Sequence, residues 1–257
     1  MKMNDIFLKH RAFIFIPFIF FTINTAVLPQ DTSKVKPVSK KNELVQFLLP
    51  TALVGFGLTC FSNNNVAPNN MNVYDWRQKH FKNFQTKADE YLTFAPTVLA
   101  YSLQFQCVKG KNNLTNMTLI YIASNAIMFG TVEGLKRITK HSRPDSSDNE
   151  SFPSAHASFV FLAADMLHFE YGSKSVWISI AGYTTAAAVG LMRILNNQHW
   201  VSDVLVGAGI GIFSNRISYL LFNKLIKNKY WKSNNLNLMI YPDIMNGGMK
   251  YGFRFNM

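Results

Sequence analysis

The sequence predicts an all-α membrane bundle of six helices, followed by a short C-terminal β-hairpin. The bundle is predicted by six apolar segments of helical length and by lysine runs that lie beside them. The hairpin is predicted by an Asn-Gly pair between two apolar runs near the C-terminus. Because the mean hydropathy is only +0.03, the membrane assignment depends on these segments and not on the average.

The first 29 residues are predicted to be a secretory signal peptide or an uncleaved N-terminal anchor. Basic residues at positions 2, 9 and 11 precede an apolar run from Ala12 to about Val27, which is the order found in leaders of exported proteins. We therefore expect the chain to be exported.

Residues 30–232 are predicted to form one helical domain, because 257 residues suit a single core and nothing in the chain looks like a linker between two. The stretch Ser62–Glu90, rich in asparagine, lysine and aromatic residues, is expected to be a surface loop or an amphipathic piece. The six segments are Leu44–Phe61, Tyr91–Val108, Leu114–Leu135, Ala155–Phe169, Ser175–Leu195 and Val201–Phe222.

The basic loops set a constraint on how many of these segments cross a membrane. If Lys109–Lys111 and the tail after Phe222 are cytoplasmic, loops 136–154 and 194–200 face outward. A cytoplasmic start, an N-terminal span and six further spans would place the same loops inside. One of the first two segments is therefore not expected to cross, and Leu44–Phe61, interrupted by Pro50 and two glycines, is the candidate.

The last 25 residues, 233–257, change in character and predict the hairpin. The runs NLMIYPDI and MKYGFRF flank an Asn-Gly pair. In the second run, apolar residues at every other position alternate with Lys250, Gly252 and Arg254, which is the pattern of a β-strand.

The formal charge of +12 suits an anionic membrane surface or an anionic substrate. Much of the excess lies at the ends of apolar segments, and no single recognition element gathers it, so we expect no nucleic-acid partner.

Three clusters in the second half of the chain combine cationic and titratable residues. In KRITKHSRP, Lys136 and Arg143 can together hold phosphate oxygens, although basic residues at the end of an apolar helix are ordinarily headgroup anchors. In FPSAHASF, a helix start at Ser154 offers free backbone N–H groups, and His156 in the first turn can give a proton. An ordinary capped helix explains the second cluster equally well.

The third cluster has the pattern R-x5-H-x3-D, formed by Arg193, His199 and Asp203. His199 and Asp203 are one helical turn apart, so we expect them on one helix face, with the carboxylate holding the imidazole. If Asp203 accepts from one ring nitrogen, the other keeps a lone pair that can attack phosphorus.

With the three clusters in this order, residues 136–203 resemble the type 2 phosphatidic acid phosphatase (PAP2) superfamily. The same signature occurs in bacterial class A acid phosphatases and vanadium haloperoxidases. The signal-like start and hairpin-like end are similar to those of exported Bacteroidetes lipid phosphatases, so a site facing the periplasm of a bacterial cell envelope is expected.

The resemblance implies a role for each motif residue. His199 corresponds to a nucleophile that forms a phosphohistidine, Asp203 to its orienting partner, and His156 to the acid that protonates the leaving group. No metal or other cofactor is needed in this scheme. The implied phosphate cradle consists of Lys136, Arg143, Ser154, the amide of Ala155, and Arg193.

Two positions depart from the family pattern. Ala155 stands where the family has glycine, a mild change if the residue has helical dihedrals and a serious one if its φ is positive. Met192 stands where serine is common before the arginine. Neither change removes a group that the expected reaction uses.

The expected activity is hydrolysis of a lipid phosphomonoester or diphosphate, such as phosphatidate, undecaprenyl diphosphate, phosphatidylglycerol phosphate or lipid A. Alternatives are a soluble periplasmic acid phosphatase, a vanadium haloperoxidase-like enzyme, or a non-catalytic membrane protein that binds phospholipid headgroups. The remaining histidines, at positions 10, 80, 141 and 168, have no partner at a useful spacing, although His141 lies inside the first cluster.

Overall fold

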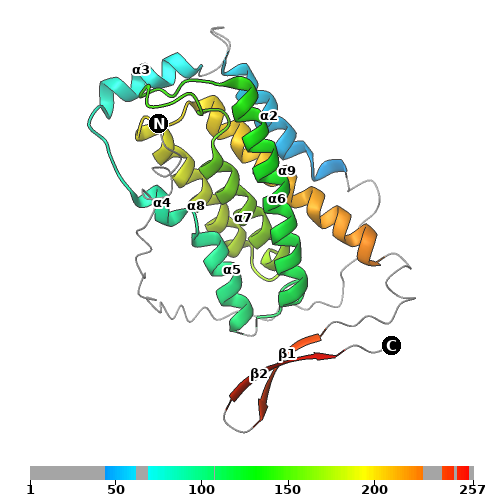
Figure 1. Ribbon diagram of the computed structural model, residues 1–257. Coiled ribbons are helices and arrows are strands. Elements are labelled where there is room, and N and C mark those ends of the chain that lie inside the picture. The colour runs from blue at the N-terminus through cyan, green and yellow to red at the C-terminus, as the bar shows by residue number, and fades with distance from the viewer. Residues whose placement is uncertain (1–43, 62–68, 107, 228–238, 246–247, 255–257) are drawn as a thin grey trace, which may run out of the picture. The chain divides into compact units, whose positions relative to one another are not determined.

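The computed structural model describes residues 44–61, 69–106, 108–227, 239–245 and 248–254, so the predicted leader lies outside the described residues. The predicted helical body is confirmed (Figure 1). Its helices are α2 (Leu48–Thr59), α3 (Asn70–His80), α4 (Ala88–Leu92), α5 (Ala95–Phe105), α6 (Leu114–Thr139), α7 (Ala155–Tyr171), α8 (Val176–Leu195) and α9 (Val201–Lys227).

Within the described part of the chain, three helices are long and apolar enough to cross a membrane: α6, α8 and α9. Their apolar stretches contain 26, 20 and 24 residues. Because an α-helix rises about 1.5 Å per residue, each stretch is at least as long as the hydrocarbon core of a bilayer is thick, which is about 30 Å. The chain is therefore a membrane protein. With 12 residues, α2 is about 18 Å long and too short to span, as expected for Leu44–Phe61.

Two segments differ from expectation. Tyr91–Val108, predicted as one helix, is divided between α4 and α5, because Pro96 lacks an N–H donor and starts a new helix in its first turn. The polar stretch Ser62–Glu90 contains a true helix, α3, whose N-cap Asn69 accepts a hydrogen bond from the Asn72 N–H.

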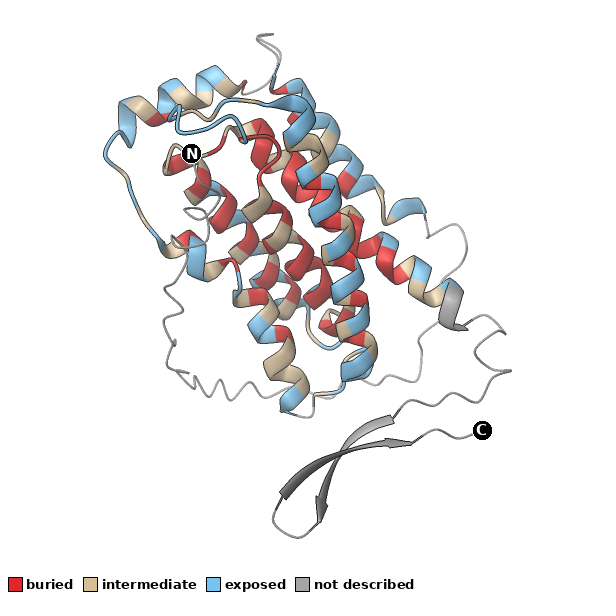
Figure 2. Cartoon of the chain, viewed as in Figure 1, coloured by how far each residue is buried: buried red, intermediate tan, exposed pale blue. Residues whose placement is uncertain are grey.

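Helix α7 is the centre of the helical body. It packs against α5, α6, α8 and α9, and buried residues cover most of its surface (Figure 2). A helix that is apolar on all sides needs neighbours on all sides, and the sequence AHASFVFLAADML supplies that property. The start of α7, which carries His156, is therefore held rigidly.

Glycines on α9 let it approach α7 closely at the end that carries the motifs. A Cβ atom at Gly207 would lie 2.6 Å from the Ser154 carbonyl oxygen, and one at Gly211 would overlap the Ser158 carbonyl. Only glycine fits where two backbones come this close. As a result, the Ser154 N–H donates to the Asp203 carbonyl at 3.0 Å, which joins the starts of α7 and α9.

Near the C-terminus, β1 (Met239–Met245) and β2 (Gly248–Arg254) pair antiparallel, in a register that runs from Met239 opposite Arg254 to Met245 opposite Gly248. The predicted turn residues 246 and 247 lie outside the described residues.

Candidate active site

Three segments meet at one end of α7: the loop after α6, the start of α7 that follows this loop directly, and the turn between α8 and α9. The Arg143 guanidinium Nη1 donates to the Gln198 carbonyl at 3.4 Å. His199 Nδ1 lies 2.9 Å from the Ser151 carbonyl oxygen. The structure thus brings together the three motifs, which the sequence spreads over residues 136–203.

The pairing of His199 with Asp203 differs from the prediction that both lie on one helical face. Helix α9 begins at Val201, so His199 precedes it. Nδ1 donates to the Ser151 carbonyl, while the Asp203 carboxylate oxygen Oδ2 lies further away, at 3.6 Å. A proton held on Nδ1 leaves Nε2 with its lone pair. The backbone carbonyl therefore sets the tautomer, and Asp203 adds charge nearby.

The Asp203 carboxylate also organises the backbone around it. Oδ2 accepts from the Trp200 N–H at 2.9 Å and from the Ser151 hydroxyl at 2.5 Å. The first bond is one half of a capping box, in which a carboxylate at the third helical position accepts from the N–H of the N-cap residue. Asp203, which is fully buried, thereby ties the loop carrying Ser151 to the turn carrying His199.

Both imidazoles of the site are held in the neutral state. Burial lowers the pKa of His199, as do the charges of Arg193 and Arg143, although Asp203 opposes the change. Burial likewise lowers the pKa of His156 to about 4, with further contributions from Arg193 and His199. At neutral pH His199 therefore keeps a nucleophilic nitrogen, and His156 carries no extra proton while the site is free.

The start of α7 has the geometry expected of an anion site. Ser154 is its N-cap, and the serine hydroxyl accepts from the Ala157 N–H at 3.4 Å, which leaves the hydroxyl proton free to be donated. Ala155 is the first helical residue and does not have a positive φ; the described non-glycine residues that do are Lys140, Ser146 and Asn197. The methyl group of Ala155 is therefore compatible with this backbone.

The two cations of the first motif, Arg143 and Lys136, have different surroundings. Arg143 is fixed by Asp148, which accepts from its Nε at 2.7 Å, and it contributes to the field at both His156 and His199. Lys136, in the last turn of α6, lies beside Asp148 in an open hollow with Asn149 and Glu150. Arg143 thus contributes to the field at both imidazoles, whereas Lys136 lines a hollow together with Asp148.

Arg193 has a buried partner that the sequence did not reveal. Its Nη1 donates to Asp89 Oδ2 at 2.8 Å, and both side chains are almost fully buried. Asn196 Nδ2 donates to the other Asp89 oxygen at 3.2 Å. Arg193 Nε is buried without a hydrogen-bond partner among the described residues. Asp89 therefore fixes the guanidinium, and Nε remains available to an anion at His156.

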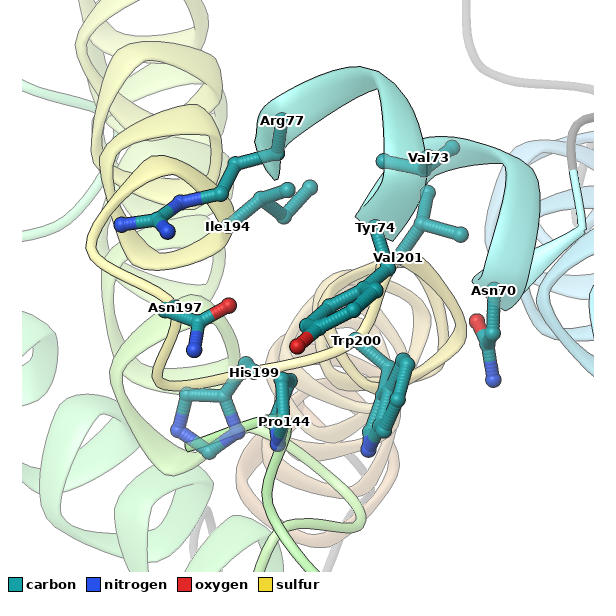
Figure 3. A pocket seen from close by; sticks show the side chains of 10 residues that line it. All are labelled: Asn70, Val73, Tyr74, Arg77, Pro144, Ile194, Asn197, His199, Trp200 and Val201. Carbon is teal, nitrogen blue, oxygen red and sulfur yellow. The ribbon is translucent and has the colours of Figure 1, made fainter. Parts of the chain in front are cut away.

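Helix α3 holds the same turn from another direction (Figure 3). Arg77 Nε donates to the Leu195 carbonyl at 2.9 Å, and Asn70 exchanges hydrogen bonds with Ser202. No spacing rule signals these contacts, since each partner is over 110 residues distant. The small pocket between α3 and the turn is lined by Asn70, Val73, Tyr74, Arg77, Pro144, Ile194, Asn197, His199, Trp200 and Val201.

Chemically, the site combines two neutral imidazoles with two fixed guanidinium groups at the start of a helix. Guanidinium and backbone N–H groups are donors that match the oxygens of a phosphate. Among the described residues, no group of three or more histidine, cysteine or carboxylate side chains is arranged to hold a metal ion.

The family comparison matches the same part of the chain. The model of the PAP2 superfamily matches residues 114–227, which include all three motifs. Lipid A 1-phosphatase of Porphyromonas gingivalis is 35% identical over 158 residues, covering 61% of this chain and 36% of that protein. Bacitracin transport permease protein BcrC of Bacillus licheniformis is 33% identical over 91 residues, covering 35% of this chain and 40% of that protein. The matches thus span two fifths or less of these curated relatives.

Two solved structures are also similar. The crystal structure of Aquifex aeolicus LpxE has a TM-score of 0.46 and 21% identity, covering 62% of this chain and 98% of that one. That of a transmembrane PAP2-type phosphatidylglycerolphosphate phosphatase from Bacillus subtilis has a TM-score of 0.44 and 19% identity, covering 71% and 98%. Residues 114–227, which carry the three motifs, thus match the PAP2 superfamily.

Proposed function

We propose that the chain is a membrane phosphatase that hydrolyses a phosphomonoester or diphosphate of a lipid through a phosphohistidine at His199. One observation carries the proposal. Around His199, whose Nδ1 is bonded to the Ser151 carbonyl, lie a second imidazole, His156, and two guanidinium groups that contribute to the field at both rings. An imidazole prepared in this way, beside fixed cations, suits attack on a phosphate and stabilisation of the charge that develops.

In the first step of the proposed reaction, Nε2 of His199 attacks phosphorus, and the bond from phosphorus to the lipid oxygen breaks. The leaving oxygen takes its proton from His156. Burial and nearby cations keep that imidazole neutral in the free site, but a bound phosphate dianion reverses the local field and favours its protonation. Substrate binding thereby loads the acid that the step needs.

In the second step, His156 removes a proton from water, the water oxygen attacks phosphorus, and the bond from phosphorus to Nε2 breaks. Inorganic phosphate leaves and His199 returns to its starting state. Arg143, Arg193 and the start of α7, with Ser154 and the Ala155 amide, hold the three equatorial oxygens in both steps. Lys136 is proposed to act at longer range, from the hollow that it lines with Asp148.

We place the site on the periplasmic side of a bacterial envelope membrane. Helix α6 begins just after Lys109–Lys111 and ends at the site, whereas α9 begins at the site and ends at Lys227. The basic ends at Lys109–Lys111 and Lys227 therefore lie away from the site, and basic ends favour the cytoplasm. The basic residues at the site end of α6 are assigned to phosphate binding in this proposal. The helical phosphatase domain over residues 30–232, the hairpin tail 233–257 and the N-terminal signal or anchor 1–29 belong to the same proposal.

The proposal is tested by phosphate release from purified protein in detergent micelles. The substrates are lipid A 1-phosphate, which the Porphyromonas relative suggests, together with phosphatidate, phosphatidylglycerol phosphate and undecaprenyl diphosphate. We expect release from at least one substrate, inhibition by vanadate, and no turnover by a folded His199→Ala variant. Full activity in that variant, or binding of lipid without release of phosphate, would overturn the proposal.

A further inference from the structure

A third imidazole, that of His141, lies beside the carboxylate that supports His199. The left-handed conformation of Lys140, with φ of 45°, turns the chain directly after α6. The His141 carbonyl then accepts from the Ser151 N–H at 2.9 Å. His141 is therefore anchored to the same residue whose own carbonyl holds His199.

The two oxygens of Asp203 serve different groups. Oδ2 accepts from Ser151 and Trp200 and faces His199. Oδ1 accepts a longer bond, 3.3 Å, from the Ser202 hydroxyl, and His141 Nδ1 lies 3.7 Å from it. The buried carboxylate thus has one imidazole on each side.

His141 Nδ1 is buried and has no hydrogen-bond partner among the described residues. A buried nitrogen without a partner is costly, and Asp203 Oδ1 is the acceptor within reach of a small rotation of the ring. Packing limits that rotation. The Phe61 ring meets the His141 ring edge to face, with the ring centroids 5.2 Å apart, and the centroid of the Trp200 ring lies 6.0 Å from that of His141.

We propose that His141 is a positioning residue of the site: it binds Asp203 Oδ1 and thereby holds the carboxylate in the orientation that supports His199. The inference rests on the proposed phosphatase function. His141 touches neither substrate nor reacting atoms, so its effect reaches the reaction through Asp203.

Two substitutions test this role. His141→Phe keeps the ring packing but removes the donor, and we expect kcat to fall about tenfold with little change in KM. His141→Gln keeps a donor that can reach Asp203 Oδ1, and we expect it to recover most of kcat. His80→Gln, on the outer face of α3, is the matched control and should behave as wild type.

The measurements are kcat and KM on a lipid phosphate that the wild type hydrolyses, with thermal unfolding in detergent for every variant. If the Phe variant does not fold, His141→Leu, which also lacks a donor, takes its place. Wild-type kcat in a folded variant without the donor, or no recovery of kcat in the Gln variant, would overturn the role of His141. An inactive wild type would instead overturn the proposed function.

Discussion

Replacing Asp89 by asparagine is expected to uncouple the arginine of the third motif from its support. Asp89 accepts from Arg193 at 2.8 Å and from Asn196 at 3.2 Å, and its side chain is 1% exposed. The change leaves the Arg193 guanidinium, 5% exposed, without a counter-charge. Breaking a buried ion pair from one side costs about 3–5 kcal/mol of folding free energy.

The effect on catalysis is expected to be separable from this destabilisation. A displacement of a positioning group by about 1 Å can cost on the order of a hundredfold in rate, so kcat/KM of Asp89→Asn should fall by about that factor. The assay is phosphate release together with thermal unfolding in the same detergent. Unchanged kcat/KM in a destabilised variant would refute the idea that Asp89 positions Arg193 for the reaction.

A matched control exists in the same bundle. Asp165, on α7, accepts from Arg216 at 2.7 Å and from Tyr183, and it is fully buried. It lies nine residues beyond His156 along the helix, about 13 Å away. Asp165→Asn should destabilise the protein on the same scale as Asp89→Asn but keep kcat/KM within about twofold of wild type.

Two further predictions concern packing and pH. Gly207→Ala places a methyl group 2.6 Å from the Ser154 carbonyl oxygen, so it should lower the free energy of unfolding by about 1–3 kcal/mol and also lower kcat. In the control Gly130→Ala, the added methyl group meets nothing within 4 Å, so this variant should unfold at or above the wild-type temperature. Because the pKa of His156 is about 4 when folded and about 6.5 when unfolded, the unfolded chain binds more protons between these values. Stability in detergent should therefore fall as pH is lowered from about 6.5 to 4, and His156→Gln should flatten that slope; an equal slope in both proteins would contradict the assignment.

The motifs and helix positions could be predicted because they depend on local patterns. The long helices α6, α8 and α9 follow from apolar periodicity. The meeting of the three motifs could be expected because their cations and imidazoles can act on one phosphate only if they lie close together. Where the prediction was wrong, a backbone detail decided. Pro96 divided one expected helix, and the start of α9 at Val201 moved His199 off the helical face that it was expected to share with Asp203.

The supporting residues could not be predicted because they act across the fold. Asp89 reaches Arg193 over 104 positions, and Arg77 reaches Leu195 over 118. Asp89 and Arg77 both precede residues 114–227, the part that the family model matches. An isolated aspartate in a five-residue helix gives no periodic signal; its role depends on how α4 packs against α8.

The central claim, that the nitrogen of His199 becomes covalently bonded to phosphorus, is tested most directly by trapping the intermediate. Wild-type protein is mixed with a lipid substrate labelled at its phosphate, quenched within milliseconds in alkali, which preserves a phosphorus–nitrogen bond, and mapped by mass spectrometry. The account predicts label on His199 in the wild type, slower labelling in His156→Gln, whose first step lacks the acid, and none in His199→Ala. Label on another residue, or rapid turnover with no labelled protein at any time, would contradict it.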